Sequence, residues 1–261
     1  MRSQLGDEHV TFHAVEEVLS YGRDDSGVHF RCRTNDGMEV PIRFELYEYG
    51  IVRFIMRPNA GNTESTYPMF ADRMPSREGF EVSEEGDSIC LRAPEILIKV
   101  NKRPWGFAVH DGTGRLIGKA DRSDVDVSMR LKILPLGFFT SKEGGAIGTV
   151  ESFDLRPDEH FYGFGEKFTS LDKRGQEIVS WSVDALGAGT EKSYKNMPFF
   201  MSSKGYGMFV NTTHRIIYHM GSQSLMSYTL SISEAKLDLG EAGVSRRSAT
   251  AEDRLGIRSR R

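Results

Sequence analysis

The amino-acid sequence predicts an all-β fold, a β-sandwich that takes up most of the 261 residues. Short apolar runs recur about every ten residues, many with alternating apolar and polar side chains, and turn-forming dipeptides separate them. No segment sustains an apolar helical stripe over several turns, although Val10 to Tyr21 could form a short helix. Many short strands of this kind are typical of sandwiches.

The first predicted pair of strands lies near the N-terminus. Gly27 to Thr34 (GVHFRCRT) and Met38 to Leu46 (MEVPIRFEL) each alternate, as a strand with one buried face does. Asp36-Gly37 between them is a strong turn signal because these residues tolerate positive φ. We therefore expect a hairpin whose apolar side faces a core.

The same signals predict the strands that follow. They are expected at Gly50 to Arg57, Gly79 to Val82, Ser88 to Arg92, Ile96 to Val100, Phe107 to His110, Leu116 to Ile117 and Val150 to Leu155. Asp121 to Gly148 mixes charge with apolar runs, and its pattern does not define strands.

Two regions are expected: a sandwich domain at residues 1–238 and an Arg-rich tail at residues 239–261. The tail has no aromatic residues and no strand pattern. Such a composition cannot bury enough apolar surface to offset its ordering entropy, so we expect disorder.

Charge and cysteine content narrow the class of protein. The formal charge of -3 gives no electrostatic reason to expect nucleic acid or an anionic membrane as a partner. Cys32 and Cys90 are too few for a disulfide framework, and we expect two buried thiols in a reducing compartment. The sequence has no apolar run that would span a bilayer and begins without the apolar core of a signal peptide, which predicts a cytoplasmic location.

No metal or cofactor is expected. None of the seven His forms a pair with metal-ligand spacing. The sequence also lacks a Gly-x-Ser-x-Gly elbow, a phosphate-cradling loop and a His-Glu-x-x-His segment. Most Asp and Glu residues fall in turns or on polar strand faces, where a solvated role is the rule.

The stretch from Phe161 to Asn211 places a long polar, Gly-rich excursion between two aromatic-rich runs. A loop of this length in a compact domain is functional or disordered, and its aromatic residues favour order against a ligand or another domain. Trp181 and Asp184 are the candidate substrate-binding residues, because a ring stacks on the C–H face of a sugar while a carboxylate accepts a hydroxyl hydrogen bond. The residues alone leave a second interpretation open, in which Asp184 caps a turn.

Gly163-Phe164-Gly165-Glu166 closes the first of these runs. It is no nucleotide loop, because the third Gly and the following helix are missing. Its glycines predict a bend or bulge where two backbones approach closely, with Glu166 and Lys167 fixing the corner.

Four blocks within Phe161 to Ser233 resemble the end of the N-terminal domain of glycoside hydrolase family 31, which contains α-glucosidases and α-xylosidases. They are FYGFGEKF, RGQEIVSWSVDA, SYKNMPFFMSSKGYGMFVNTT and MGSQSLMSYTLSIS, in the family's order, with a spelling nearer the bacterial α-xylosidases. The resemblance implies a galactose-mutarotase-like β-sandwich that packs on a (β/α)8 barrel. The family's loop Asp falls on Asp184, and Trp181 lies beside it and supports the loop.

The resemblance also implies where catalysis resides. In the family the barrel supplies an Asp nucleophile and an Asp acid/base for a retaining mechanism. The family-like text ends near Leu237-Asp238, so we expect no catalytic residue in this chain and a truncated or frame-shifted reading as the cause. An α-linked xyloside or glucoside is the expected ligand, bound weakly or not at all without the barrel.

Three functions are left to weigh. The first is an N-terminal glycosidase module that is inactive alone, the second a free-standing carbohydrate-binding module. The third, an aldose epimerase, shares the fold, but no placed His and Glu pair is evident in the sequence. Loss of the barrel should also expose an apolar surface near Phe199, Phe200 and Tyr206, which would promote self-association.

Overall fold

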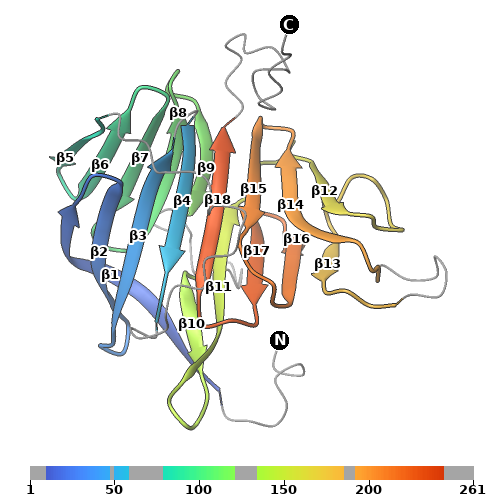
Figure 1. The fold of residues 1–261 in the computed structure, drawn as a ribbon. Helices are drawn as coiled ribbons and strands as arrows, with labels where there is room; N and C mark the ends of the chain where they lie inside the picture. The colour runs from blue at the N-terminus through green and yellow to red at the C-terminus, as the bar shows by residue number, and fades with distance from the viewer. Residues whose placement is uncertain (1–9, 48–49, 59–78, 121–133, 185–191, 244–261) are drawn as a thin grey trace, which may run out of the picture.

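The computed structural model describes residues 10–47, 50–58, 79–120, 134–184 and 192–243. Within these ranges the regular structure is β, with strands β1 to β18 and no α-helix, as predicted (Figure 1). Neighbouring strands in both sheets pair antiparallel. The all-β prediction is confirmed.

A 13-stranded sheet makes up most of the sandwich, in the order β12-β14-β15-β18-β4-β3-β2-β1-β10-β11-β17-β16-β13. In Figure 1, β16 and β17 lie behind β14 and β15, so one continuous sheet supplies both layers. Its strands are β1 (Thr11–Arg23), β2 (Gly27–Thr34), β3 (Glu39–Tyr47), β4 (Ile51–Met56), β10 (Gly137–Thr140), β11 (Ala146–Asp154), β12 (Phe161–Gly165), β13 (Glu177–Ser180), β14 (Asn196–Ser202), β15 (Tyr206–Val210), β16 (Ile216–Ser224), β17 (Ser227–Ile232) and β18 (Leu237–Gly243).

Strand β1 is where the sheet passes from one layer to the other. Its first residues pair with β10 and the rest with β2, and the register shifts between Val15 and Glu17. Such bulges bend a strand and increase its twist. The helix considered for Val10 to Tyr21 is therefore wrong, because pairing on two sides outweighs a weak local preference.

The second sheet has five strands in the order β5-β6-β7-β8-β9. They are β5 (Glu81–Glu85), β6 (Ser88–Ala93), β7 (Ile96–Asn101), β8 (Gly106–Asp111) and β9 (Leu116–Ala120). Strand β9 lies next to β11 and so extends one layer of the sandwich. The strands predicted at Ser88 to Arg92, Phe107 to His110 and Leu116 to Ile117 are confirmed.

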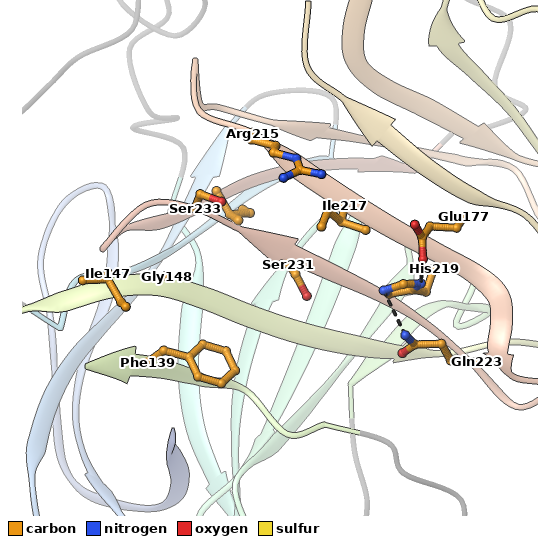
Figure 2. Close-up of a pocket in the computed structure, with 11 residues that line it drawn as sticks. Phe139, Ile147, Gly148, Glu177, Arg215, Ile217, His219, Gln223, Ser231 and Ser233 are labelled. Atoms are coloured by element: carbon orange, nitrogen blue, oxygen red, sulfur yellow. Dashed lines mark hydrogen bonds and ion pairs between the residues drawn. The ribbon is translucent and has the colours of Figure 1, made fainter. Parts of the chain in front are cut away.

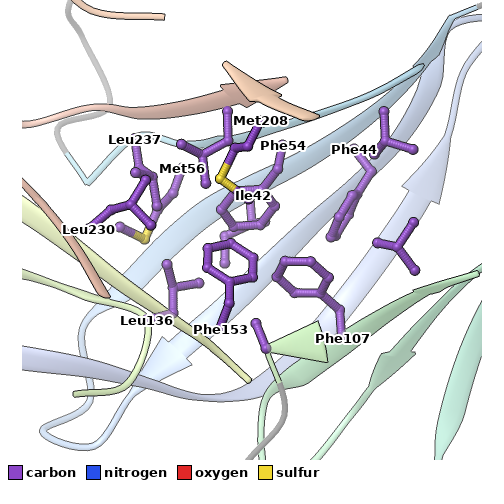
Figure 3. Close-up of a cluster of buried hydrophobic side chains, with 14 of the residues drawn as sticks. Ile42, Phe44, Phe54, Met56, Phe107, Leu136, Phe153, Met208, Leu230 and Leu237 are labelled. Carbon is purple, nitrogen blue, oxygen red and sulfur yellow. The ribbon is translucent and has the colours of Figure 1, made fainter. Parts of the chain in front are cut away.

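The core joins the two sheets through phenylalanine rings (Figure 3). The ring centroid of Phe107 on β8 lies 5.2 Å from that of Phe44, 5.3 Å from that of Phe54 and 6.1 Å from that of Phe153. Because each such ring contributes roughly 1.5–3 kcal/mol when buried, this cluster is a main source of stability. The free thiols of Cys32 and Cys90 are buried, as predicted.

The end of the sandwich differs from the prediction. Strand β18 runs on to Gly243 and lies between β15 and β4, with Leu239 and Glu241 buried. Residues 239–243, which were expected in the tail, therefore belong to the sheet, because β15 and β4 supply hydrogen-bonding partners on both sides of β18. Residues 244–261 lie outside the described residues, and their disorder stays a prediction.

Candidate functional site

The loop that carries the predicted site residues leaves the sandwich after β13 and returns at β14, on the right of Figure 1. Trp181 follows the end of β13 directly, and Asp184 comes three residues later. Residues 185–191 lie outside the described part of the chain. The base of this loop is therefore the part whose geometry is defined.

Hydrogen bonds fasten the two ends of the loop to each other. Ser182 and Ser193 form a parallel bridge, and the Val183 amide donates to the Ser193 carbonyl at 3.1 Å. The Asn196 side-chain amide donates to the same carbonyl at 2.9 Å. Trp181, one residue before this clasp, is thereby held at a fixed place.

The glycine-flanked corner that was predicted as a bulge supports this base. The β12–β14 register shifts between Gly163 and Gly165, and Phe164 between them has a φ of 68°. The buried Phe164 ring stacks on Phe200 with centroids 5.2 Å apart, and this burial offsets the strained backbone. A Cβ at Gly165 would come 2.2 Å from the Lys195 carbonyl oxygen, so glycine is required there.

Two lysines beside the corner have different partners. The Lys167 ammonium donates to the Val179 carbonyl oxygen at 2.8 Å and to Asn196 Oδ1, so it links β13 to β14. Lys195 pairs with Glu166 at 3.0 Å, but both side chains are exposed and such pairs contribute little. Fixation of the corner is confirmed and comes mainly from Lys167.

A hollow of about 350 Å³ opens at the loop base. Its described lining combines one indole with hydroxyl, amide and imidazole groups and contains no carboxylate; it consists of Ser180, Trp181, Ser182, Asn196, Pro198, Thr212, Thr213, His214 and Ile216. Trp181 is 51% exposed on this wall, which is unusual for so large a ring. Glu234 accepts a hydrogen bond from Thr212 Oγ1 at 2.6 Å and lies 3.5 Å from His214 Nδ1, which orients both.

The two predicted site residues are placed differently. Trp181 lines the hollow, whereas Asp184 is exposed and does not. Asp184 makes no hydrogen bond or ion pair with any residue in the described ranges. A sugar contact by Asp184 stays a prediction, since it stands where the described part of the loop ends.

Two of the three residues that were predicted near an exposed apolar surface do not lie on the surface. Phe200 and Tyr206 are buried, and the Tyr206 hydroxyl donates to Glu159 at 2.7 Å. On β14 the half-buried Phe199 shares its face with the exposed Met197 and Met201, because successive side chains of a strand point to opposite faces. Trp181 and Tyr194 are also exposed.

A second pocket, the sheet-face pocket, lies on the outer face of β10, β11, β16 and β17 and has a volume of about 90 Å³ (Figure 2). Its lining residues are Phe139, Ile147, Gly148, Glu177, Arg215, Ile217, His219, Gln223, Ser231, Ile232 and Ser233. His219 Nδ1 lies 3.3 Å from a Glu177 carboxylate oxygen, and His219 Nε2 lies 3.1 Å from the Gln223 amide nitrogen. Burial lowers the pKa of His219, and the Glu177 charge opposes this.

No placed His and Glu pair is evident in the sequence, but the fold brings Glu177 and His219 together. Glu177 and His219 are direct cross-strand partners of β13 and β16, 42 positions apart in the sequence. Sequence reasoning missed them because only the register of that strand pair brings them together. Alternation in β16, which leaves His219 on the face opposite Tyr218, was the available signal.

No cluster of three or more His, Cys, Asp or Glu suited to a metal ion occurs among the residues that the structure describes. None of those residues forms a helix of the length and apolarity needed to cross a bilayer.

Residues 41–218 match the family model of the glycosyl hydrolase 31 N-terminal galactose mutarotase-like domain. The chain belongs to this family. The match begins well before Phe161, so it includes the β5–β6 and β8–β9 hairpins. It also covers β13, β14 and the loop between them.

Relatives of the glycosyl hydrolase 31 domain include full-length enzymes. The chain is 34% identical over 194 residues to an α-xylosidase of Emericella nidulans, a match that covers 70% of this chain and 22% of that protein. It is 43% identical over 75 residues to an α-xylosidase of Lactiplantibacillus pentosus, covering 29% of this chain and 10% of the relative. The chain thus spans a quarter or less of these relatives.

Solved structures show the same fold. The cycloalternan-forming enzyme of Listeria monocytogenes, in complex with a pentasaccharide substrate, has a TM-score of 0.75 at 20% identity, covering 90% of this chain and 21% of the other. A Flavobacterium johnsoniae dextranase complexed with glucose has a TM-score of 0.69 at 24% identity, covering 88% and 26%. The galactose-mutarotase-like sandwich is thereby confirmed.

Proposed function

We propose that this chain is the N-terminal domain of a retaining α-glycosidase of the α-xylosidase or α-glucosidase type, and that its Trp181 loop forms one wall of the substrate pocket. The observation that carries the proposal is the half-exposed Trp181 on the wall of a polar hollow, at the base of a clasped loop. An exposed indole at a defined place offers an apolar face and one N–H donor to a ligand.

The chemistry of the hollow suits a saccharide. The Trp181 ring offers a face for sugar C–H groups, and Ser182, Asn196 and Thr212 offer donors and acceptors for hydroxyls. Asp184 adds a charge-assisted hydrogen bond to a hydroxyl when the loop lies over the ligand. The names of the two sequence relatives, both α-xylosidases, support an α-linked xyloside as the ligand.

Hydrolysis needs two carboxyl groups on either side of the glycosidic bond. The described lining of the hollow supplies none. We assign both groups to the part of the full-length relatives that these 261 residues do not span, and we expect the chain alone to bind weakly and to leave the bond intact. An open wall leaves most of a ligand in water, so its dissociation constant should be millimolar.

The alternatives rank lower. A free-standing carbohydrate-binding module would use the same hollow but would have to bind without a second wall. An aldose epimerase needs its acid and base apart, with the sugar between them. Here the Glu177 carboxylate contacts His219 directly and Gln223 occupies the other ring nitrogen, so no gap separates the pair.

A fluorescence titration of the 261-residue chain with methyl α-D-xyloside and methyl α-D-glucoside tests the proposal. Trp105 is buried and Trp181 exposed, so a saturable change reports on the hollow and should vanish in Trp181→Phe. In parallel, aryl α-xyloside should stay uncleaved. Turnover that is abolished by changing a residue of this chain would show that the chain itself supplies catalytic groups. A titration without a fluorescence change would show that the hollow does not bind these sugars.

A further inference from the structure

The sheet-face pocket contains a guanidinium group without a partner in the described structure. Arg215 is half-buried, and its side chain makes no hydrogen bond or ion pair with any described residue. Its own carbonyl oxygen accepts a hydrogen bond from the Ser233 amide at 3.0 Å, so the backbone beneath it is fixed. In Figure 2 the guanidinium extends over the sheet beside Ile217. A partly desolvated guanidinium with open donors is suited to bind a ligand oxygen.

The opposite end of the pocket is a fixed hydrogen-bonding array. The Gln223 amide donates to His219 Nε2, so the proton of the neutral ring is on Nδ1, which lies 3.3 Å from a Glu177 carboxylate oxygen and 3.4 Å from Ser222 Oγ. Burial lowers the pKa of His219 and so favours this neutral ring. One Gln223 amide hydrogen, its carbonyl oxygen and the second Glu177 oxygen then remain for a ligand.

Apolar side chains complete the lining of the pocket (Figure 2). They are Phe139, Ile147 and Ile217. Gly148 has no side chain and so leaves space beside the Phe139 ring. A Cβ at Gly148 would lie 3.9 Å from the Phe139 ring and 3.1 Å from the Ile232 carbonyl oxygen. A ligand ring with one apolar face and polar edges could therefore contact the apolar side chains with its face and the polar groups with its edges.

We propose that the sheet-face pocket is a second saccharide-binding site, which takes one edge of a neutral sugar ring. An anion that pairs with Arg215 meets the like charge of Glu177, and a cation that pairs with Glu177 meets that of Arg215, whereas hydroxyls both donate and accept and satisfy the two ends. A volume of about 90 Å³ equals that of roughly three water molecules, so only part of a pyranose is enclosed. Binding is therefore weak, with a dissociation constant of order millimolar.

This site is separate from the hollow beside Trp181. Both use β13 and β16, but Ser180 and Ile216 face the hollow, whereas Glu177, Ile217 and His219 face the pocket. The two sites can therefore be tested apart in one chain.

The test is an NMR titration of the ¹⁵N-labelled 261-residue chain with D-glucose and D-xylose, following the Gly148 amide and the Gln223 side-chain amide. We expect saturable shifts of both signals, weakened roughly tenfold in Arg215→Ala and in Gln223→Ala, as the loss of a ligand hydrogen bond predicts. Trp181→Phe should leave these shifts unchanged, which separates this site from the proposed function.

Three results would overturn the inference. One is the absence of shifts at about 100 mM sugar, far above a millimolar dissociation constant. Another is the loss of the shifts in Trp181→Phe, which would assign them to the hollow. The third is tighter binding of D-glucuronate than of D-glucose, which would show that Arg215 selects an anion. Gln223 is exposed, so Gln223→Ala should fold. The test therefore remains decisive even if Arg215→Ala does not fold.

Discussion

Arg53 and Asp238 form a buried two-pronged ion pair that joins β4 to β18. Arg53 Nε lies 2.8 Å from one carboxylate oxygen of Asp238, and the second guanidinium nitrogen lies 2.7 Å from the other. The Asp238 side chain is fully buried, and Asn211 donates to it at 2.8 Å. The last strand of the sheet is thus fixed by a charge network.

Replacing Asp238 by Ala should cost about 3–5 kcal/mol of unfolding free energy, because it leaves the Arg53 charge buried without its main partner. Urea denaturation measures this loss. Glu85→Gln is the control, since its contacts with Arg92 and Lys99 are exposed and long, and it should cost about 1 kcal/mol or less. Equal losses of unfolding free energy in both variants would show that the buried Arg53–Asp238 pair matters no more for stability than an exposed one.

Glu241 gives the protein a pH-dependent stability. Burial raises the pKa of Glu241 from 4.5 to about 7, and the nearby Glu159 charge adds to the rise while Arg156 opposes it. A carboxyl whose folded pKa lies above its unfolded one contributes stability that is present at low pH and lost as pH rises between those values. Stability should therefore fall between pH 4.5 and about 7.

The variant Glu241→Gln removes this dependence. Relative to the unchanged protein, it should gain about 3 kcal/mol of unfolding free energy between pH 4.5 and roughly pH 8, whatever its offset at low pH. Denaturation at a series of pH values measures the difference. If that difference stayed constant across the range, Glu241 would not titrate as its burial implies.

The corner at Gly165 should be sensitive to a methyl group. Gly165 and Gly175 have φ values of 82° and 79°, so alanine is strained by about 1–2 kcal/mol at either position. Only at Gly165 does the new Cβ meet backbone, 2.2 Å from an oxygen, whereas at Gly175 it meets open space. Thermal unfolding should show the larger loss for Gly165→Ala. Equal losses in the two variants would mean that the positive φ, and not the close approach of the Lys195 carbonyl oxygen, is the reason for a glycine at position 165.

Lys167 should position the loop that carries Trp181. Lys167→Ala removes the link between Val179 and Asn196, and we expect greater acrylamide quenching of Trp181 and a weaker response to methyl α-D-xyloside. Lys195→Ala, which removes an exposed ion pair and a cation–π contact with Tyr194 on the same loop, should leave both unchanged. The assignment fails if the two variants behave alike.

Local signals in the sequence were sufficient to predict much of the fold. The turn at Asp36-Gly37, where Gly37 has a φ of 93°, and the alternation on either side of it predicted the β2–β3 hairpin. The glycines around Phe164 predicted the bulge. Trp181 was predicted as a site residue because an aromatic ring near an Asp in a Gly-rich loop can stack on a sugar while the carboxylate binds a hydroxyl.

Non-local pairing accounts for what was missed. Strand β18 has no local signature, and it is a strand because β4 and β15 supply partners on both sides. Phe200 and Tyr206 face the core because of the phase of β14 and β15, which a one-residue slip would reverse. The Glu177–His219 pair depends on register in the same way.

The most direct test of the central claim is a crystal structure of the 261-residue chain soaked with methyl α-D-xyloside at a concentration well above millimolar. The account predicts an intact glycoside in the hollow, its C–H face on the Trp181 indole and its hydroxyls toward Asn196 and Thr212. A hollow that stays empty while Trp181 turns into the protein interior would contradict it.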